Sequence, residues 1–161
     1  MISLHKNQVK FNSNIIISHT GGRLSSDSGL VLVKEVMDTF KFSDLAKSLL
    51  DIKDNRAYYT HDNLAILEQL IMQLIAGYSA DSSANLLRRD PVFQAVLGKK
   101  ELASQSSISR FLDRFTETNI GLLQSLNQSL IDKARLIRND TELIIDVDST
   151  HSDTFGHQEQ A

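Results

Sequence analysis

Residues 61–78, HDNLAILEQLIMQLIAGY, carry the strongest helical pattern in the chain. A helix over this stretch is apolar around most of its circumference, and a helix of that kind is normally buried. We therefore predict a helix capped by Thr60 that forms the central pillar of a helical domain. Its apolar positions are Leu64, Ile66, Leu67, Leu70, Ile71, Met72, Leu74 and Ile75.

Helical periodicity continues on both sides of this segment. Asp90 followed by Pro91 is typical of a helix start, and Gly98 is typical of a helix end. Two short apolar stretches within residues 8–18 are compatible with a small hairpin. The predicted fold is therefore mainly α, with further helices at about 26–40, 43–49, 81–87, 91–97, 104–115 and 118–138.

The composition limits the classes of protein that this chain can belong to. Its 161 residues, 41% of them apolar, suffice for one domain or for a domain plus part of another. The absence of cysteine excludes disulfides and thiolate metal sites. A net charge of −3 argues against a protein that coats polyanions as a whole, but it leaves room for a local basic face. With no apolar signal core and no apolar run of about 18 residues, we expect a cytoplasmic protein without a membrane partner.

A different pattern begins near the end of the chain, where residues 141–148 read TELIIDVD. The alternation of β-branched and polar residues predicts a strand of roughly six residues. Asp146 and Asp148 share one face of such a strand with Ile144. Two carboxylates at the end of an apolar strand are costly to bury unless their charge is offset. A divalent metal ion would offset it, and solvent at the tip of the strand would do so equally well.

The change of composition near Asn139 predicts a boundary between a helical region, 1–139, and the start of a second domain, 140–161. A lone strand exposes unpaired backbone groups. We therefore expect it either to pair with the N-terminal stretch or to belong to a domain that is incomplete in this chain. His151 and His157 follow the strand, either as surface histidines or as additional metal ligands.

A second candidate site surrounds the predicted helix–loop–helix at 91–115. Its cations would contact DNA phosphates, and Gln105 is a candidate for reading a base edge. The alternative is the solvated face of an ordinary helical bundle, because the linker is long for a helix-turn-helix. The candidate DNA-binding residues are Arg88, Arg89, Lys99, Lys100, Gln105, Arg110 and Arg114.

The polar stretch 51–60, DIKDNRAYYT, is predicted to be a loop. Arg56, Tyr58 and Tyr59 within it would either contact a nucleic-acid backbone or pack their rings on the next helix. Of these two interpretations, packing on the helix is the one that the residue types favour.

Four segments of the chain resemble the front part of a bacterial insertion-sequence transposase, most closely the group numbered thirteen-eighty. They are SSDSGLVLVKE (25–35), IAGYSADSSANLLRRDPVF (75–93), ASQSSISRF (103–111) and IIDVDSTHSDTFGHQE (144–159). The resemblance implies a helical region that binds transposon-end DNA. It also implies an RNase H-like domain whose first strand carries the first aspartate of a catalytic DDE triad.

Within that pattern Asp148, followed by Ser149-Thr150, corresponds to the first aspartate, and the neighbouring Asp146 does not. The resemblance thus implies a catalytic, Mg²⁺-holding role for Asp148. The second aspartate and the glutamate of the family are expected downstream of Ala161, which predicts a truncated chain. One carboxylate cannot hold two metal ions, so we expect no catalysis by this chain alone.

Three hypotheses follow from these observations. The first is an N-terminal fragment of a DDE transposase whose partner is the terminal inverted repeat DNA of its element. The second is a non-catalytic regulator that binds the same DNA, or that pairs with full-length transposase or with itself. The third is a remnant of a decayed element with marginal stability.

Overall fold

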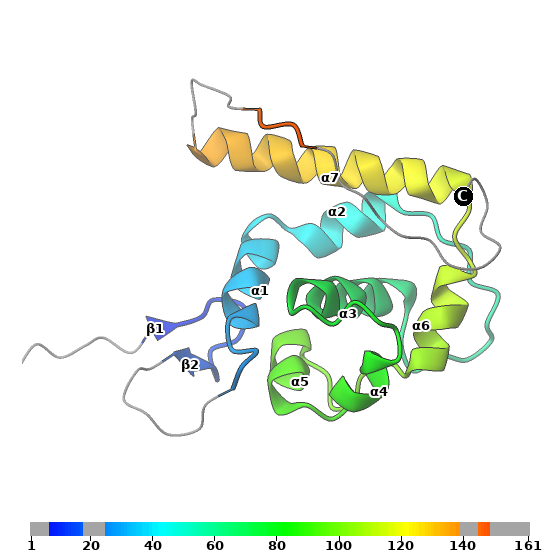
Figure 1. Ribbon diagram of the computed structural model, residues 1–161, viewed down its shortest axis with the longest axis horizontal. Helices are drawn as coiled ribbons and strands as arrows, with labels where there is room; N and C mark the ends of the chain where they lie inside the picture. The colour runs from blue at the N-terminus through cyan, green and yellow to red at the C-terminus, as the bar shows by residue number, and fades with distance from the viewer. Residues whose placement is uncertain (1–6, 18–24, 139–144, 149–161) are drawn as a thin grey trace, which may run out of the picture.

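A computed structural model of the protein describes residues 7–17, 25–138 and 145–148. Within these ranges a short hairpin is followed by a bundle of helices (Figure 1), which confirms a mainly α protein. The elements are β1 (Asn7–Gln8), β2 (Ile16–Ile17), α1 (Leu30–Thr39), α2 (Phe42–Leu49), α3 (Asn63–Ile75), α4 (Ser83–Leu87), α5 (Pro91–Leu97), α6 (Gln105–Leu112) and α7 (Glu117–Arg138).

The hairpin expected at 8–18 is present, although its paired segment is short. β1 and β2 run antiparallel, with Asn7 opposite Ile17 and Gln8 opposite Ile16. The carboxylate of Glu35 on α1 accepts a hydrogen bond from the backbone N–H of Lys10 at 2.8 Å. This contact holds the hairpin against the first helix.

Helix α3 occupies the middle of the bundle (Figure 1), as predicted for the apolar stretch. Ile66 and Met72 are fully buried, and they belong to different apolar clusters. Ile66 lies among residues of α2, α6 and α7, whereas Met72 lies among residues of α1 and α5. Helix α3 therefore contributes to two separate apolar clusters. It is not buried all round, because Leu74 and Ile75 at its C-terminal end are 52% and 53% exposed.

The start of α3 differs from the prediction by two residues. Asp62, not Thr60, caps the helix, and its carboxylate accepts a hydrogen bond from the Ala65 N–H at 2.7 Å. Asp and Thr both satisfy the free N–H groups of a first turn, so the sequence pattern does not distinguish them.

Buried polar side chains on α3 tie it to its neighbours. Glu68 accepts a hydrogen bond and ion pair from Lys34 of α1 at 3.0 Å. It also accepts a hydrogen bond from the Ser43 hydroxyl of α2. Ser43, at the start of the helix predicted at 43–49, therefore does not cap α2 and instead joins three helices.

The other helix boundaries agree only in part with those predicted from the sequence. Asp90 accepts hydrogen bonds from Val92 and Phe93 N–H, both at 2.9 Å, and Gly98 ends α5 with a φ of 63°. These boundaries are confirmed. The helix predicted from about residue 26 begins later, because α1 starts after Gly29, which provides no side-chain cap.

Helix α7 packs along the outer side of α2 (Figure 1). Leu126 is 3% exposed at this contact. The ammonium of Lys133 donates to the Phe40 carbonyl at 2.7 Å, and the Asn119 amide donates to the Asp51 carbonyl at 3.0 Å. Near the C-terminal end of the helix, Ile137 is 65% exposed.

Residues 145–148 form no strand, so the strand predicted at 141–148 is wrong for the part that the structure describes. Ile145 and Val147 are 72% and 86% exposed. A strand is stabilised by backbone hydrogen bonds to a neighbouring strand. The described residues place no such strand beside this segment. Residues 139–144 and 149–161, with the predicted domain boundary, His151 and His157, lie outside the described residues.

Candidate nucleic-acid interface

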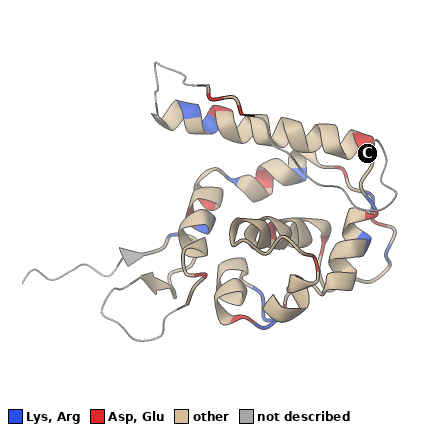
Figure 2. Cartoon of the chain, viewed as in Figure 1, with Lys and Arg blue, Asp and Glu red and all other residues tan. Residues whose placement is uncertain are grey.

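Four basic residues lie on the segments that flank α5. Arg88 and Arg89 follow α4, and Lys99 and Lys100 follow α5 (Figure 2). The Arg89 side chain is 86% exposed, and both lysines are exposed. The carboxylate of Glu101 lies 3.1 Å from Arg88 Nε and 3.9 Å from Arg89 Nε. Glu101 thus pairs with the two arginines, and the two lysines add further positive charge beside them. We call the surface formed by Arg88, Arg89, Lys99 and Lys100 the basic linker surface.

The linker that carries these lysines is anchored in the core. Leu102 and Ala103 are each 1% exposed. The Leu102 N–H donates to the Arg88 carbonyl at 3.2 Å. The side-chain amide of Gln69 on α3 donates to the Ala103 carbonyl at 2.9 Å and accepts from the Ala103 N–H at 2.8 Å. The cations are therefore presented by a fixed segment.

The two candidate DNA-binding arginines of the segment 104–115 lie in different environments. Arg110 is exposed. Arg114 lies beyond the end of the helix at Leu112, and its Nη2 donates to Asn63 Oδ1 at 2.6 Å. Its guanidinium also lies 5.8 Å from the centre of the Phe111 ring. Arg114 thus joins α6 to the start of α3, and it is Arg110 that faces solvent.

Gln105, the predicted base reader, makes contacts within the protein. Its Nε2 donates to Asp81 Oδ2 at 3.0 Å, and its backbone N–H donates to Asn85 Oδ1 at 3.0 Å. The side chain therefore fastens α6 to α4. Nothing in the local sequence pattern distinguishes this arrangement from an outward-facing amide, because Asp81 is 24 residues away.

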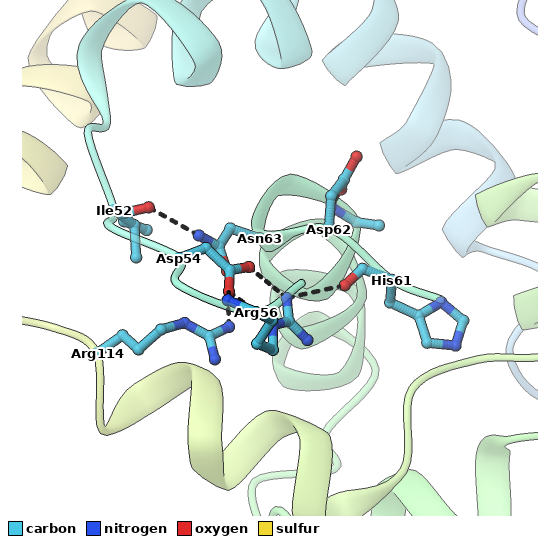
Figure 3. Close-up of polar contacts among 8 residues, drawn as sticks. Ile52, Asp54, Arg56, His61, Asp62, Asn63 and Arg114 are labelled. Atoms are coloured by element: carbon cyan, nitrogen blue, oxygen red, sulfur yellow. Dashed lines mark hydrogen bonds and ion pairs between the residues drawn. The ribbon is translucent and has the colours of Figure 1, made fainter. Parts of the chain in front are cut away.

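The loop between α2 and α3 is organised by an ion pair (Figure 3). Arg56 Nε donates to Asp54 Oδ1 at 2.7 Å, and Nη2 donates to Oδ2 at 2.5 Å and to the His61 carbonyl at 3.2 Å. The hydrogen bonds from Arg56 lower the pKa of Asp54 to about 2. The same pairing raises the pKa of Arg56.

Two tyrosines of this loop face solvent. Tyr58 is 94% exposed and Tyr59 is 58% exposed. The Arg56 guanidinium lies 5.1 Å from the centre of the Tyr59 ring. The interpretation in which both rings pack on the next helix is therefore wrong for Tyr58.

His61 connects this loop to the basic linker surface. Its ring points away from the Asp54–Arg56 pair (Figure 3). Burial lowers its pKa, and the positive charges of Lys99 and Arg88 lower it further.

A pocket of about 330 Å³ lies between α2, this loop and the start of α3. Its lining combines apolar side chains with the polar and charged residues Lys47, Asp54, Tyr59, Asp62 and Asn63. Sequence reasoning did not identify the pocket, because its walls come together only when the helices pack.

Asp146 and Asp148 are exposed in the segment 145–148. Their carboxylate oxygens are the ligand type that Mg²⁺ prefers. However, in the part of the chain that the structure describes, no three His, Cys, Asp or Glu side chains gather where they could hold a metal ion. The described residues alone therefore do not make a two-metal site.

Comparison with known families identifies the chain as a transposase of the DDE type. It belongs to the family described as transposase DDE domain, group 1, which matches residues 7–161. Proteins of this family act on DNA and generally use divalent metal ions. No curated protein and no solved structure matches the chain. Among the described helices, none is both long and apolar enough to cross a membrane.

Proposed function

We propose that this chain is the N-terminal, DNA-binding part of a DDE transposase and that it binds the terminal inverted repeats of its element. The observation that carries the proposal is the basic linker surface, formed by Arg88, Arg89, Lys99 and Lys100 on a segment anchored by Gln69. Family membership supports DNA as the partner. Arg110 adds an exposed cation on the neighbouring helix.

Phosphate contacts hold a protein in register on a duplex, and they require exposed cations at fixed positions. Arg89, Lys99, Lys100 and Arg110 meet both conditions. Arg114 and Gln105 also remain proposed DNA-binding residues. In the structure, Arg114 contacts Asn63 and Gln105 contacts Asp81, and both contacts position α6.

Asp148 is the proposed catalytic aspartate and one proposed Mg²⁺ ligand for strand cleavage and transfer in the transposition reaction. Further carboxylates must complete such a site, and among the described residues no cluster of three His, Cys, Asp or Glu side chains could hold a metal ion. We expect that the 161-residue chain with Mg²⁺ neither nicks nor joins DNA. Metal-dependent nicking that Asp148→Ala abolishes would contradict this expectation.

The binding proposal is tested by fluorescence anisotropy with a terminal inverted repeat duplex and a scrambled duplex of equal composition. Each lost phosphate contact lowers the slope of log K against log salt by about 0.9. Lys99→Ala plus Lys100→Ala is therefore expected to weaken binding to both duplexes and to reduce the slope by about 2. Arg135→Ala is the control, because Arg135 is also exposed, at 62%, but lies on α7.

Preference for the inverted repeat over the scrambled duplex would support sequence-specific end binding. Unchanged affinity and salt slope after replacing Arg89, Lys99 and Lys100 together by Ala would overturn the assignment of this surface. Absence of binding to either duplex would overturn the proposed function.

A second candidate is a regulator that pairs with full-length transposase or with another copy of itself. It is favoured by large exposed apolar side chains near the end of α7 and in 145–148, where Leu136 and Val147 are 84% and 86% exposed. Such side chains often mark interaction sites. Sedimentation velocity over a concentration series, compared with Leu136→Glu, measures self-association directly. A monomer at every concentration would exclude self-pairing.

A further inference from the structure

The aromatic rings of the α2–α3 loop are exposed and are therefore available to a binding partner. Tyr58, at 94% exposure, gains almost no stability from folding, because its ring remains in water. Tyr59 keeps 58% of its surface exposed, although Arg56 lies over its ring. Aromatic residues that combine exposure with a fixed backbone are typical of binding surfaces.

The loop that presents them is held by polar contacts along its length (Figure 3). Asn119 binds the Asp51 carbonyl, and the Asn63 amide donates to the Ile52 carbonyl at 2.9 Å. In the middle, Arg56 joins Asp54 to the His61 carbonyl. A loop ordered in advance loses little conformational entropy on binding, so the tyrosines are suited to contact a ligand directly.

The charges around the tyrosines are mixed. Arg56 offsets the carboxylate of Asp54, Lys53 is exposed beside them, and Asp51 and Asp62 are exposed at the two ends of the loop. The features suited to a nucleobase are therefore the ring faces and the guanidinium over Tyr59, and not a net positive charge. At the far end of the loop, His61 is close enough to Lys99 and Arg88 for their charges to act on it. The tyrosines immediately precede α3, and Gln69 of α3 holds the linker segment through both backbone groups of Ala103. The loop and the basic linker surface are therefore attached to the same helix.

We propose that Tyr58 and Tyr59 form a stacking site for unpaired nucleobases next to the duplex held by the basic linker surface. This inference rests on the proposed DNA-binding function. Bases inside a duplex are already stacked, so an aromatic side chain gains most from a base whose face is free. Stacking on an aromatic ring is worth about tenfold in affinity per base.

The test compares a plain duplex with the same duplex carrying a four-nucleotide single-stranded extension that contains 2-aminopurine. We expect the extended duplex to bind about tenfold more tightly or better, with quenching of the 2-aminopurine emission by stacking. A third ligand carries an abasic extension, which has the same phosphates but no bases. It should bind like the plain duplex.

Variants separate the rings from other features of the loop. Tyr58→Ala plus Tyr59→Ala should reduce the ratio of extended to plain duplex affinity to about one, whereas Tyr58→Phe plus Tyr59→Phe should preserve it. Arg135→Ala on α7 should leave the ratio unchanged. The chain has three tyrosines and no tryptophan, so quenching of its own tyrosine emission gives an independent readout. Circular dichroism confirms that each variant is folded.

The outcomes distinguish this inference from the function on which it rests. Equal affinity for plain and extended duplexes, or an abasic extension that binds as tightly as a natural one, overturns the stacking site and leaves duplex binding intact. A preference that survives the double Ala variant also overturns it. No binding to any of the three ligands overturns the proposed function as well.

Discussion

Gln69 and Ala103 are joined by two hydrogen bonds in the core, one in each direction between the side-chain amide and the peptide backbone. They are 34 residues apart in sequence and are 2% and 1% exposed. Ala103 lies just before α6 and just after the basic linker surface. A glutamine on the central helix therefore fixes the position of the surface proposed to hold DNA.

Replacing Gln69 by Leu should destabilise the protein by about 3 kcal/mol, because it leaves a buried N–H and a buried C=O of Ala103 without partners. Gln73, one turn further along α3, is the matched control. It is fully buried, and neither its Nε2 nor its Oε1 has a hydrogen-bond partner in the described residues. Gln73→Leu should leave the protein at least as stable as the parent. Urea unfolding of both variants measures the difference, and equal losses would contradict the role given to Gln69.

The ion pair in the α2–α3 loop should be visible in an acid titration. The pKa of Asp54, about 2, lies below its usual value of 3.8, so its pairing stabilises the fold above pH 3.8 and loses that effect as the pH falls towards 2. Carboxyl ¹³C NMR should report the low pKa directly. In Arg56→Gln we expect the pKa of Asp54 to return towards 3.8. An unchanged pKa in this variant would show that Arg56 does not set it.

Arg110 and Arg114 should respond oppositely to truncation. Arg110→Ala should weaken duplex binding and lower the salt slope by about 0.9, with no change in urea midpoint, because the side chain is exposed. Arg114→Ala should cost about 1–2 kcal/mol of stability through loss of its hydrogen bond to Asn63. Measuring stability and binding on both variants tests the assignment. A stability loss confined to Arg110→Ala would reverse it.

The two residues that precede α5 and α6 should differ as helix caps. Asp90→Ala should destabilise by about 1 kcal/mol, because its carboxylate accepts two backbone hydrogen bonds at the start of α5. The Ser104 side chain makes no capping hydrogen bond, and its hydroxyl lies within hydrogen-bond distance of the hydroxyls of Ser106 and Ser107. Ser104→Ala should therefore change stability by less than about 0.5 kcal/mol. Thermal and urea unfolding provide the comparison.

Helix boundaries were predicted correctly from the sequence where they depend only on neighbouring residues. The Asp90-Pro91 start and the Gly98 end of α5 depend on adjacent residues, and both were predicted correctly. The roles of Ser43 and Gln105 depend on Glu68 and Asp81, which are distant in sequence. Their side chains can cap a helix or face solvent in isolation, so no local pattern assigns them.

The candidate site shows the same division. Its cations were identified from the sequence, because Lys and Arg next to helix ends are normally exposed. Arg114 was misplaced because α6 ends at Leu112, one turn earlier than its apolar periodicity suggests. The exposure of Tyr58 was not predicted, because whether a loop ring packs inward depends on the room left by neighbouring helices.

The sequence by itself determined that the chain is mainly helical, that residues 61–78 build its centre, and that basic residues gather around α5. The periodicity of apolar residues and the composition suffice for these conclusions, because both show which side chains are buried and which face water. Only the tertiary structure decided that Gln69 holds the basic linker, that Arg114 turns towards Asn63, and that Tyr58 faces solvent. Each of these depends on a contact or a space between segments far apart in the chain.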